Sequence, residues 1–63
     1  MSNNKWFILK IPNNCNIRLL IRLVDLFEIE AEYDFISGEC VTYTYNDYKL
    51  IKRIVLNCLY EVN

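Results

Sequence analysis

The stretch "EIEAEYDF", residues 28–35, alternates acidic and apolar residues along its whole length. Its apolar members are Ile29, Ala31, Tyr33 and Phe35, and its acidic members are Glu28, Glu30, Glu32 and Asp34. Successive side chains of a β-strand point to opposite faces of the sheet, so this alternation predicts a strand with one buried face and one acidic face. The acidic set belongs to a chain whose formal net charge is only −1.

A β-hairpin is predicted to begin with this strand. Ser37 and Gly38 supply a turn, and "CVTYTY" at 40–45 has the Val, Thr and Tyr content that strands favour. A two-residue turn that places Ile36 opposite Glu39 fixes the remaining pairs. Those pairs are Asp34 with Val41, Glu32 with Tyr43, and Glu30 with Tyr45. A three-residue loop or a bulge would shift the register by one residue, and that alternative stays open.

An earlier strand is predicted at 5–11, "KWFILKI", and Pro12 ends it because proline cannot donate to a β-ladder. Phe7, Leu9 and Ile11 share one face of this strand, and Trp6, Ile8 and Lys10 share the other.

Two helices are predicted on either side of the hairpin. The first spans about 15–27, with Asn13 or Asn14 as its N-cap, and it is apolar except for a narrow stripe. That stripe consists of Arg18, Arg22 and Asp25. The second spans about 47–60, with Asn46 or Asp47 as its N-cap. Its polar face consists of Lys49, Lys52, Arg53 and Asn57.

The predicted element order is β-α-β-β-α in a single domain, residues 1–63. We expect an α+β fold with a three-stranded antiparallel sheet and two helices packed on one face. This order is the first five elements of a ferredoxin-like βαββαβ unit. The C-terminal "EVN" is too short for a sixth strand, so the first strand keeps an open edge. We therefore expect a homodimer, with Trp6 and Ile8 in its contact.

The composition argues against catalysis. The chain has no histidine to serve as a general base, and its carboxylates have no predicted pocket that would shift a pKa. Cys15, near the start of the first helix, is the one candidate nucleophile. We expect Cys15, Cys40 and Cys58 to be buried as small apolar residues, and we expect no metal and no cofactor.

The cysteine usage indicates a reduced, cytoplasmic protein. The three cysteines are odd in number and contain no CxxC pair, and the N-terminus lacks the apolar core of a signal peptide. The longest apolar region, "LLIRLVDLF", is interrupted by Arg22 and Asp25, so no membrane span is expected.

The acidic strand face has two interpretations. It is either a solvated surface that blocks aggregation or a recognition surface on which aromatic rings supply area and carboxylates supply steering. The outward residues of the predicted hairpin include no Lys, Arg, Ser or Gln, and this uniform composition favours recognition. The predicted protein interface consists of Glu30, Glu32, Asp34, Tyr43 and Tyr45.

A small nucleic-acid-binding regulator that uses the basic face of the second helix is the alternative function. Phosphate-binding domains are usually basic, whereas the isoelectric point here is about 5.2, so nucleic acid is the less favoured partner.

In size and character the chain resembles the small phage-encoded inhibitors of bacterial defence systems, such as the anti-CRISPR proteins and the very short inhibitor of the Hachiman system. The segments "MSNNKWFILKIPNN" and "YNDYKLIKRIVLNCLYEVN" illustrate this character, which is that of a very short apolar domain rich in Asn, Ile, Lys and Tyr. The resemblance implies a stoichiometric binder of a host defence protein, including nucleic-acid-processing enzymes whose basic grooves an acidic surface could occupy.

Overall fold

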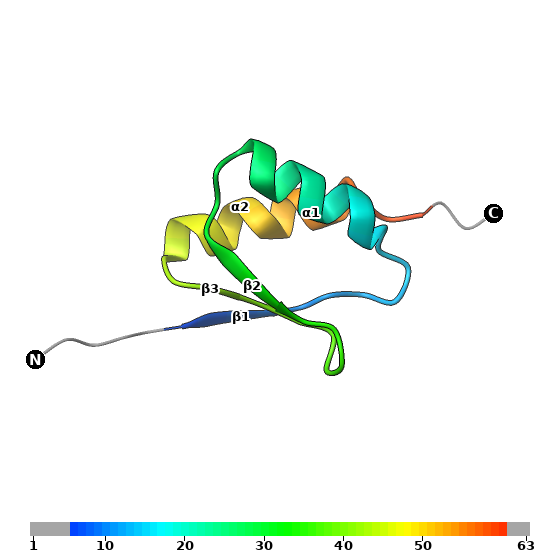
Figure 1. Ribbon diagram of the computed structural model, residues 1–63, viewed down its shortest axis with the longest axis horizontal. Helices are drawn as coiled ribbons and strands as arrows, with labels where there is room; N and C mark the ends of the chain where they lie inside the picture. The colour runs from blue at the N-terminus through cyan, green and yellow to red at the C-terminus, as the bar shows by residue number, and fades with distance from the viewer. Residues whose placement is uncertain (1–5, 61–63) are drawn as a thin grey trace, which may run out of the picture.

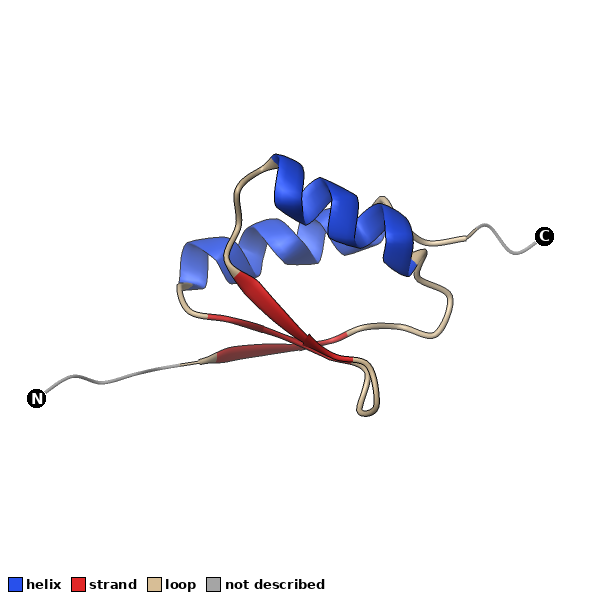
Figure 2. Ribbon diagram, viewed as in Figure 1, coloured by secondary structure: helices blue, strands red, loops and turns tan. Residues whose placement is uncertain are grey.

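The computed structural model describes residues 6–60, which form three strands and two helices in the predicted order. The elements are β1 (Phe7–Lys10), α1 (Ile17–Leu26), β2 (Ala31–Asp34), β3 (Glu39–Thr42) and α2 (Tyr45–Leu56). The sheet is antiparallel with the order β1-β3-β2, and both helices lie on one of its faces (Figures 1 and 2). The α+β prediction is therefore confirmed. Lys5 of the predicted first strand and the C-terminal "EVN" lie outside the described residues.

The core lies between the sheet and the two helices. It contains Leu20 and Val24 of α1, three residues of α2, and apolar residues from the strands and loops. The members from α2 and from the rest of the chain are Ile51, Ile54, Val55, Ile11, Ile29, Cys15, Cys40 and Cys58. All three cysteines are free and buried, which confirms their predicted role as small apolar residues.

The helix-facing side of the sheet also buries one hydroxyl. Thr42 is only 1% exposed, and its Oγ1 donates a hydrogen bond to the Phe7 carbonyl at 3.2 Å. The bond satisfies a polar group that would be costly to bury alone, and it ties β3 to β1.

The first helix begins later than predicted. Its N-cap is Asn16, whose side chain accepts from the Leu19 amide at 3.2 Å, so neither Asn13 nor Asn14 caps it. Cys15 instead pairs with Leu59 in an isolated β-bridge, and the Asn16 amide donates to the Cys58 carbonyl at 2.7 Å. This contact with the distant end of the chain holds Cys15 out of the helix.

Glu28 lies just beyond the C-cap of α1, which is Phe27, and does not belong to the strand. Its φ of 56° is the left-handed conformation that commonly follows the last turn of a helix, usually at glycine or asparagine. The amides of Glu28 and Ile29 donate to the carbonyls of Asp25 and Val24, which closes the helix end. The acidic ladder on the sheet side therefore begins at Glu30.

The second helix begins earlier than predicted, and the predicted strand through 45 is too long. The N-cap is Thr44, whose Oγ1 accepts from the Asp47 amide at 3.1 Å, so neither Asn46 nor Asp47 is the cap. Tyr45 is consequently the first residue of α2. Because β3 ends at Thr42, Tyr45 cannot pair with Glu30.

The predicted hairpin pairs were also wrong, although the predicted faces are right. Residues 35–38 form the loop, so Asp34 pairs with Glu39 and Glu32 pairs with Val41. This register differs from the prediction by two residues, and an even shift leaves every side chain on the same face. The Asp34 carboxylate stabilises the longer loop, because it accepts from the amides of Ile36 at 3.0 Å and Ser37 at 3.3 Å.

Substitution of Thr44 by alanine tests the corrected start of α2. The change removes the oxygen that accepts from the Asp47 amide, and we expect the free energy of unfolding to fall by about 0.5–2 kcal/mol. Urea denaturation measures this difference. Thr44→Ser keeps the hydroxyl and should stay close to the wild type, whereas equal stability of Thr44→Ala and wild type would refute the cap.

Candidate protein-binding face

The face of the sheet opposite the helices is called here the outer sheet face (Figure 2). Register and alternation arrange its side chains in three rows that cross β1, β3 and β2. Two rows lie within the ladders: Ile8, Val41 and Glu32, then Lys10, Glu39 and Asp34. The third row continues the same alternation just beyond the ladders, with Trp6, Tyr43 and Glu30. Apolar side chains therefore collect over β1 and β3, and carboxylates line β2.

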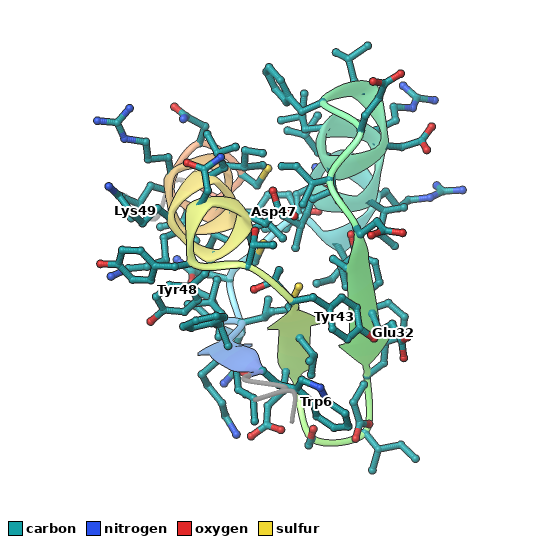
Figure 3. The ribbon with its side chains drawn as sticks, turned by 90° about the vertical axis from the view of Figure 1, so that its left-hand side faces the viewer. Trp6, Glu32, Tyr43, Asp47, Tyr48 and Lys49 are labelled. Carbon is teal, nitrogen blue, oxygen red and sulfur yellow. The ribbon has the colours of Figure 1, made fainter. Side chains whose placement is uncertain are left out.

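The centre of this face is aromatic and open to solvent. The Trp6 and Tyr43 rings meet edge to face, with centroids 6.4 Å apart (Figure 3). Trp6 is 63% exposed, and Ile8 beside it is 53% exposed. A cluster of large apolar side chains on an uncovered sheet face is a typical site for protein contact.

A hydrogen bond links the acidic side of the face to the aromatic centre. The Tyr43 hydroxyl donates a hydrogen bond to Glu32, a diagonal neighbour on β2 (Figure 3). That bond raises the pKa of Tyr43, and burial and the charges of Glu32 and Glu30 raise it further. Tyr43 therefore stays protonated at neutral pH and orients Glu32 toward the aromatic centre.

Asp34 has a structural task in addition to its place on this face. The amides of Ser37 and Ile36 donate to its carboxylate, and these bonds lower the pKa of Asp34. Asp34 therefore stabilises the hairpin loop through its charge. This structural role accounts for an acidic residue at position 34 without a binding partner.

Tyr45 does not belong to the outer sheet face. Its ring packs against Phe7 with centroids 5.8 Å apart, and Phe7 points to the helix side of the sheet. The structure thus brings together six predicted contact residues and separates Tyr45 from them. Those six are Trp6, Ile8, Glu30, Glu32, Asp34 and Tyr43. Glu39 and Lys10 share the face but were not predicted as site residues, although period-two alternation places them there.

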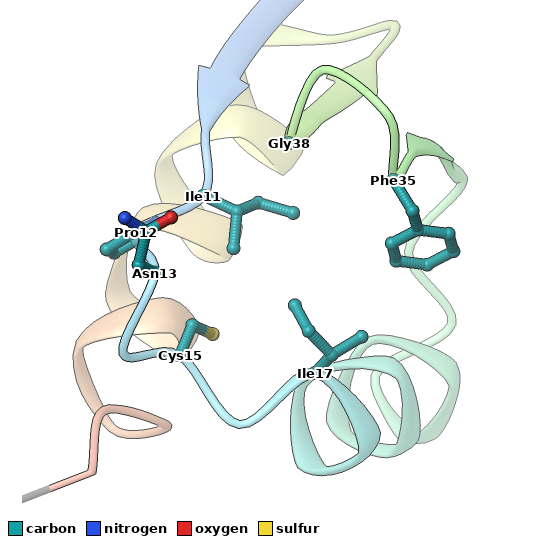
Figure 4. A pocket seen from close by; sticks show the side chains of 7 residues that line it. All are labelled: Ile11, Pro12, Asn13, Cys15, Ile17, Phe35 and Gly38. Carbon is teal, nitrogen blue, oxygen red and sulfur yellow. The ribbon is translucent and has the colours of Figure 1, made fainter.

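A separate recess of about 310 Å³ lies between the end of β1, the hairpin loop and the start of α1 (Figure 4). It is mostly apolar and is lined by Ile11, Pro12, Asn13, Cys15, Ile17, Phe35 and Gly38. Burial raises the pKa of the Cys15 thiol, and Cys58 raises it further. The thiolate is the nucleophilic form of cysteine, so the raised pKa makes Cys15 a weaker nucleophile at neutral pH.

Among residues 6–60, no group of three or more Cys, Asp or Glu side chains could hold a metal ion. Neither described helix has the length and apolar character needed to cross a bilayer. No protein-family model, curated protein or solved structure matches the chain.

The pH dependence of stability tests the role of Asp34. Its folded pKa lies below its ordinary value, so its contribution is complete above the unfolded pKa of about 3.9 and is lost as pH falls through the folded pKa. We expect Asp34→Ala to melt at a lower temperature than wild type at pH 7. Thermal unfolding should show this difference shrinking below about pH 3.9.

Asp34→Asn is the matched control, because its amide oxygen can accept the same backbone hydrogen bonds without a charge. It should retain part of the wild-type stability at pH 7. A difference between wild type and Asp34→Ala that stays constant down to strongly acidic pH would contradict the assignment.

Proposed function

We propose that this chain is a non-catalytic protein-binding module that docks on its partner through the outer sheet face. The observation that supports this proposal is the exposed aromatic centre of Trp6 and Tyr43 beside a line of carboxylates on the helix-free side of the sheet. The aromatic rings offer contact area with little conformational entropy to lose, and the carboxylates favour partners with a basic surface.

The carboxylates of this face are not neutralised by ion pairs with the described lysines and arginines. Lys10, the one cation among the described residues of the face, donates to the Ser37 carbonyl at 3.0 Å. Within residues 6–60, no lysine or arginine forms an ion pair with a carboxylate. Alternate residues of a strand are about 6.6–6.8 Å apart, so Glu30, Glu32 and Asp34 present a line of negative charge.

The favoured partner is a host defence protein, and the favoured effect is inhibition. A nucleic-acid-processing enzyme carries a basic groove for phosphates, and a line of carboxylates next to aromatic rings could occupy such a groove. The resemblance of the chain to small phage-encoded inhibitors supports this choice. The proposed setting is the host cytoplasm.

A nucleic-acid-binding regulator is the second candidate. Lys49, Lys52 and Arg53 lie exposed on α2. Lys49 lies over the Tyr45 ring and Lys52 over the Tyr48 ring, and cations next to aromatic rings are typical of single-strand binding. The net charge of −1 and the acidic outer sheet face oppose this candidate, because they repel phosphates.

Charge reversal on β2 and just before it tests the proposed face. Wild type and the double variant Glu30→Lys/Glu32→Lys would each serve as bait in host lysate, with captured proteins identified by mass spectrometry. We expect wild type to retain one host protein in near-stoichiometric amount, and we expect the double variant to lose it. Binding should also weaken with rising salt.

The matched control is Asp25→Lys/Glu28→Lys, which makes the same charge change at the end of α1, away from the outer sheet face. This control should retain the captured protein. Equal capture by all three baits, with folding verified by circular dichroism, would refute the outer sheet face as the docking surface.

The homodimer remains a prediction. Trp6, just before β1, and Ile8, on β1, are exposed, so a second copy that covered them would remove apolar surface from water. Such a copy would compete with the protein partner for the outer sheet face. Sedimentation equilibrium at micromolar concentration should give about twice the chain mass of 7.6 kDa. Trp6→Ala/Ile8→Ala should shift the equilibrium to monomer, and a monomeric wild type would refute the dimer.

A further inference from the structure

The outer edge of β1 carries main-chain groups that point away from the sheet. The Ile11 amide donates to the Gly38 carbonyl at 2.7 Å, so the N–H and C=O groups of Ile11 point toward the β3 side of the strand. Along a β-strand, the N–H and C=O groups of successive residues point alternately to the two sides of the strand. Phe7 and Leu9 therefore bond toward β3, and the N–H and C=O groups of Ile8 and Lys10 face the edge of the sheet that no other described strand covers, called here the open edge.

A group of aromatic and cationic side chains lies on the helix side of this edge. We call it the aromatic–lysine cluster, and it consists of Phe7, Tyr45, Tyr48, Lys49 and Lys52. The Phe7 ring centroid lies 5.8 Å from that of Tyr45 and 5.9 Å from that of Tyr48. The Lys49 Nζ lies 5.6 Å from the Tyr45 centroid, and the Lys52 Nζ lies 5.4 Å from that of Tyr48.

The cluster is an accessible cationic surface. Tyr45 is 59% exposed, and neither Lys49 nor Lys52 is paired with a carboxylate within the described residues. Figure 3 shows Tyr48 and Lys49 on the side of α2 turned away from α1, while Asp47 points between the two helices. The carboxylates of Glu32 and Asp34 stand on the opposite face of the sheet, on the strand farthest from β1.

We propose that the open edge of β1 and the aromatic–lysine cluster together bind an extended, carboxylate-bearing segment of a partner protein, which adds a fourth strand to the sheet. The main chain of the added strand would bond to Ile8 and Lys10. Every second side chain would point toward α2, at intervals of about 6.6–6.8 Å. Carboxylates at those positions would meet Lys49 and Lys52, and the tyrosine rings would cover their stems.

Charge and main-chain geometry favour this occupant over two others. A second copy paired through its own β1 would bring the Lys49 and Lys52 side chains of both chains together, and like charges oppose that arrangement. A nucleic-acid strand could contact the lysines, but it has no peptide main chain to continue the ladder at Ile8 and Lys10. The lysines of the cluster lie on the helix side of the sheet, and the proposed site shares only Ile8 and Lys10 with the outer sheet face. The two proposals can therefore fail independently.

The probe is a short peptide that alternates glutamate and valine, compared with the same peptide carrying lysine for glutamate and with single-stranded oligothymidylate. Fluorescence anisotropy measures binding, and amide hydrogen exchange locates it. We expect the acidic peptide to bind, to slow exchange at the amides of Ile8 and Lys10, and to bind less tightly as salt rises. The basic peptide and the oligonucleotide should bind at least about tenfold more weakly.

The double variant Lys49→Glu/Lys52→Glu should lower the affinity for the acidic peptide about tenfold or more. Arg18→Glu/Arg22→Glu makes the same charge change on α1 and should leave that affinity near the wild-type value. Glu30→Lys/Glu32→Lys should also leave it undiminished, which separates this surface from the outer sheet face.

Four results would overturn the proposal. They are failure of the acidic peptide to bind, equal binding of the basic peptide, tighter binding of the oligonucleotide, and protection of the Ile8 and Lys10 amides by self-association without any peptide. The third result would assign the cluster to nucleic acid, and the fourth would assign the edge to a second copy.

Discussion

The structure depends on the one-sided burial of a three-stranded sheet. Two helices cover one face, and their residues Leu20 and Ile51 are almost completely removed from water there. Because strand residues alternate between faces, burying Cys40 and Thr42 forces Glu39, Val41 and Tyr43 outward. The exposed aromatic and acidic surface is therefore a direct consequence of how the core is built.

Local polar contacts then determine where each outward side chain stands. The Asp34 carboxylate holds the hairpin loop, and this loop sets the register that places Glu32 opposite Val41 and within reach of the Tyr43 hydroxyl. The Thr44 cap ends the extended segment and turns Tyr45 into α2. Tyr43 therefore lies on the outer sheet face, whereas Tyr45 lies in the aromatic–lysine cluster on the other side of the sheet.

Most of the candidate face could be predicted because it follows from period-two alternation, which survives a register shift of two residues. Glu30, Glu32, Asp34, Tyr43, Trp6 and Ile8 were assigned on that basis. Tyr45 was misplaced because its β-propensity suggested a longer strand, whereas the hydroxyl of Thr44 began a helix. The ring contacts of Phe7 with Tyr45 and Tyr48 join residues far apart in the chain, and no local pattern indicates them.

The sequence by itself determined the element order, the two faces of each strand and the helix-free acidic surface, because short-range periodicity encodes each of these. The burial of the cysteines followed from their chemistry as small apolar residues. Tertiary structure decided the hairpin register, both helix starts and the surroundings of the β1 edge. These features arise from contacts between distant segments, such as Asn16 with Cys58 and Ile11 with Gly38, and from the competition of side-chain caps with strand propensity.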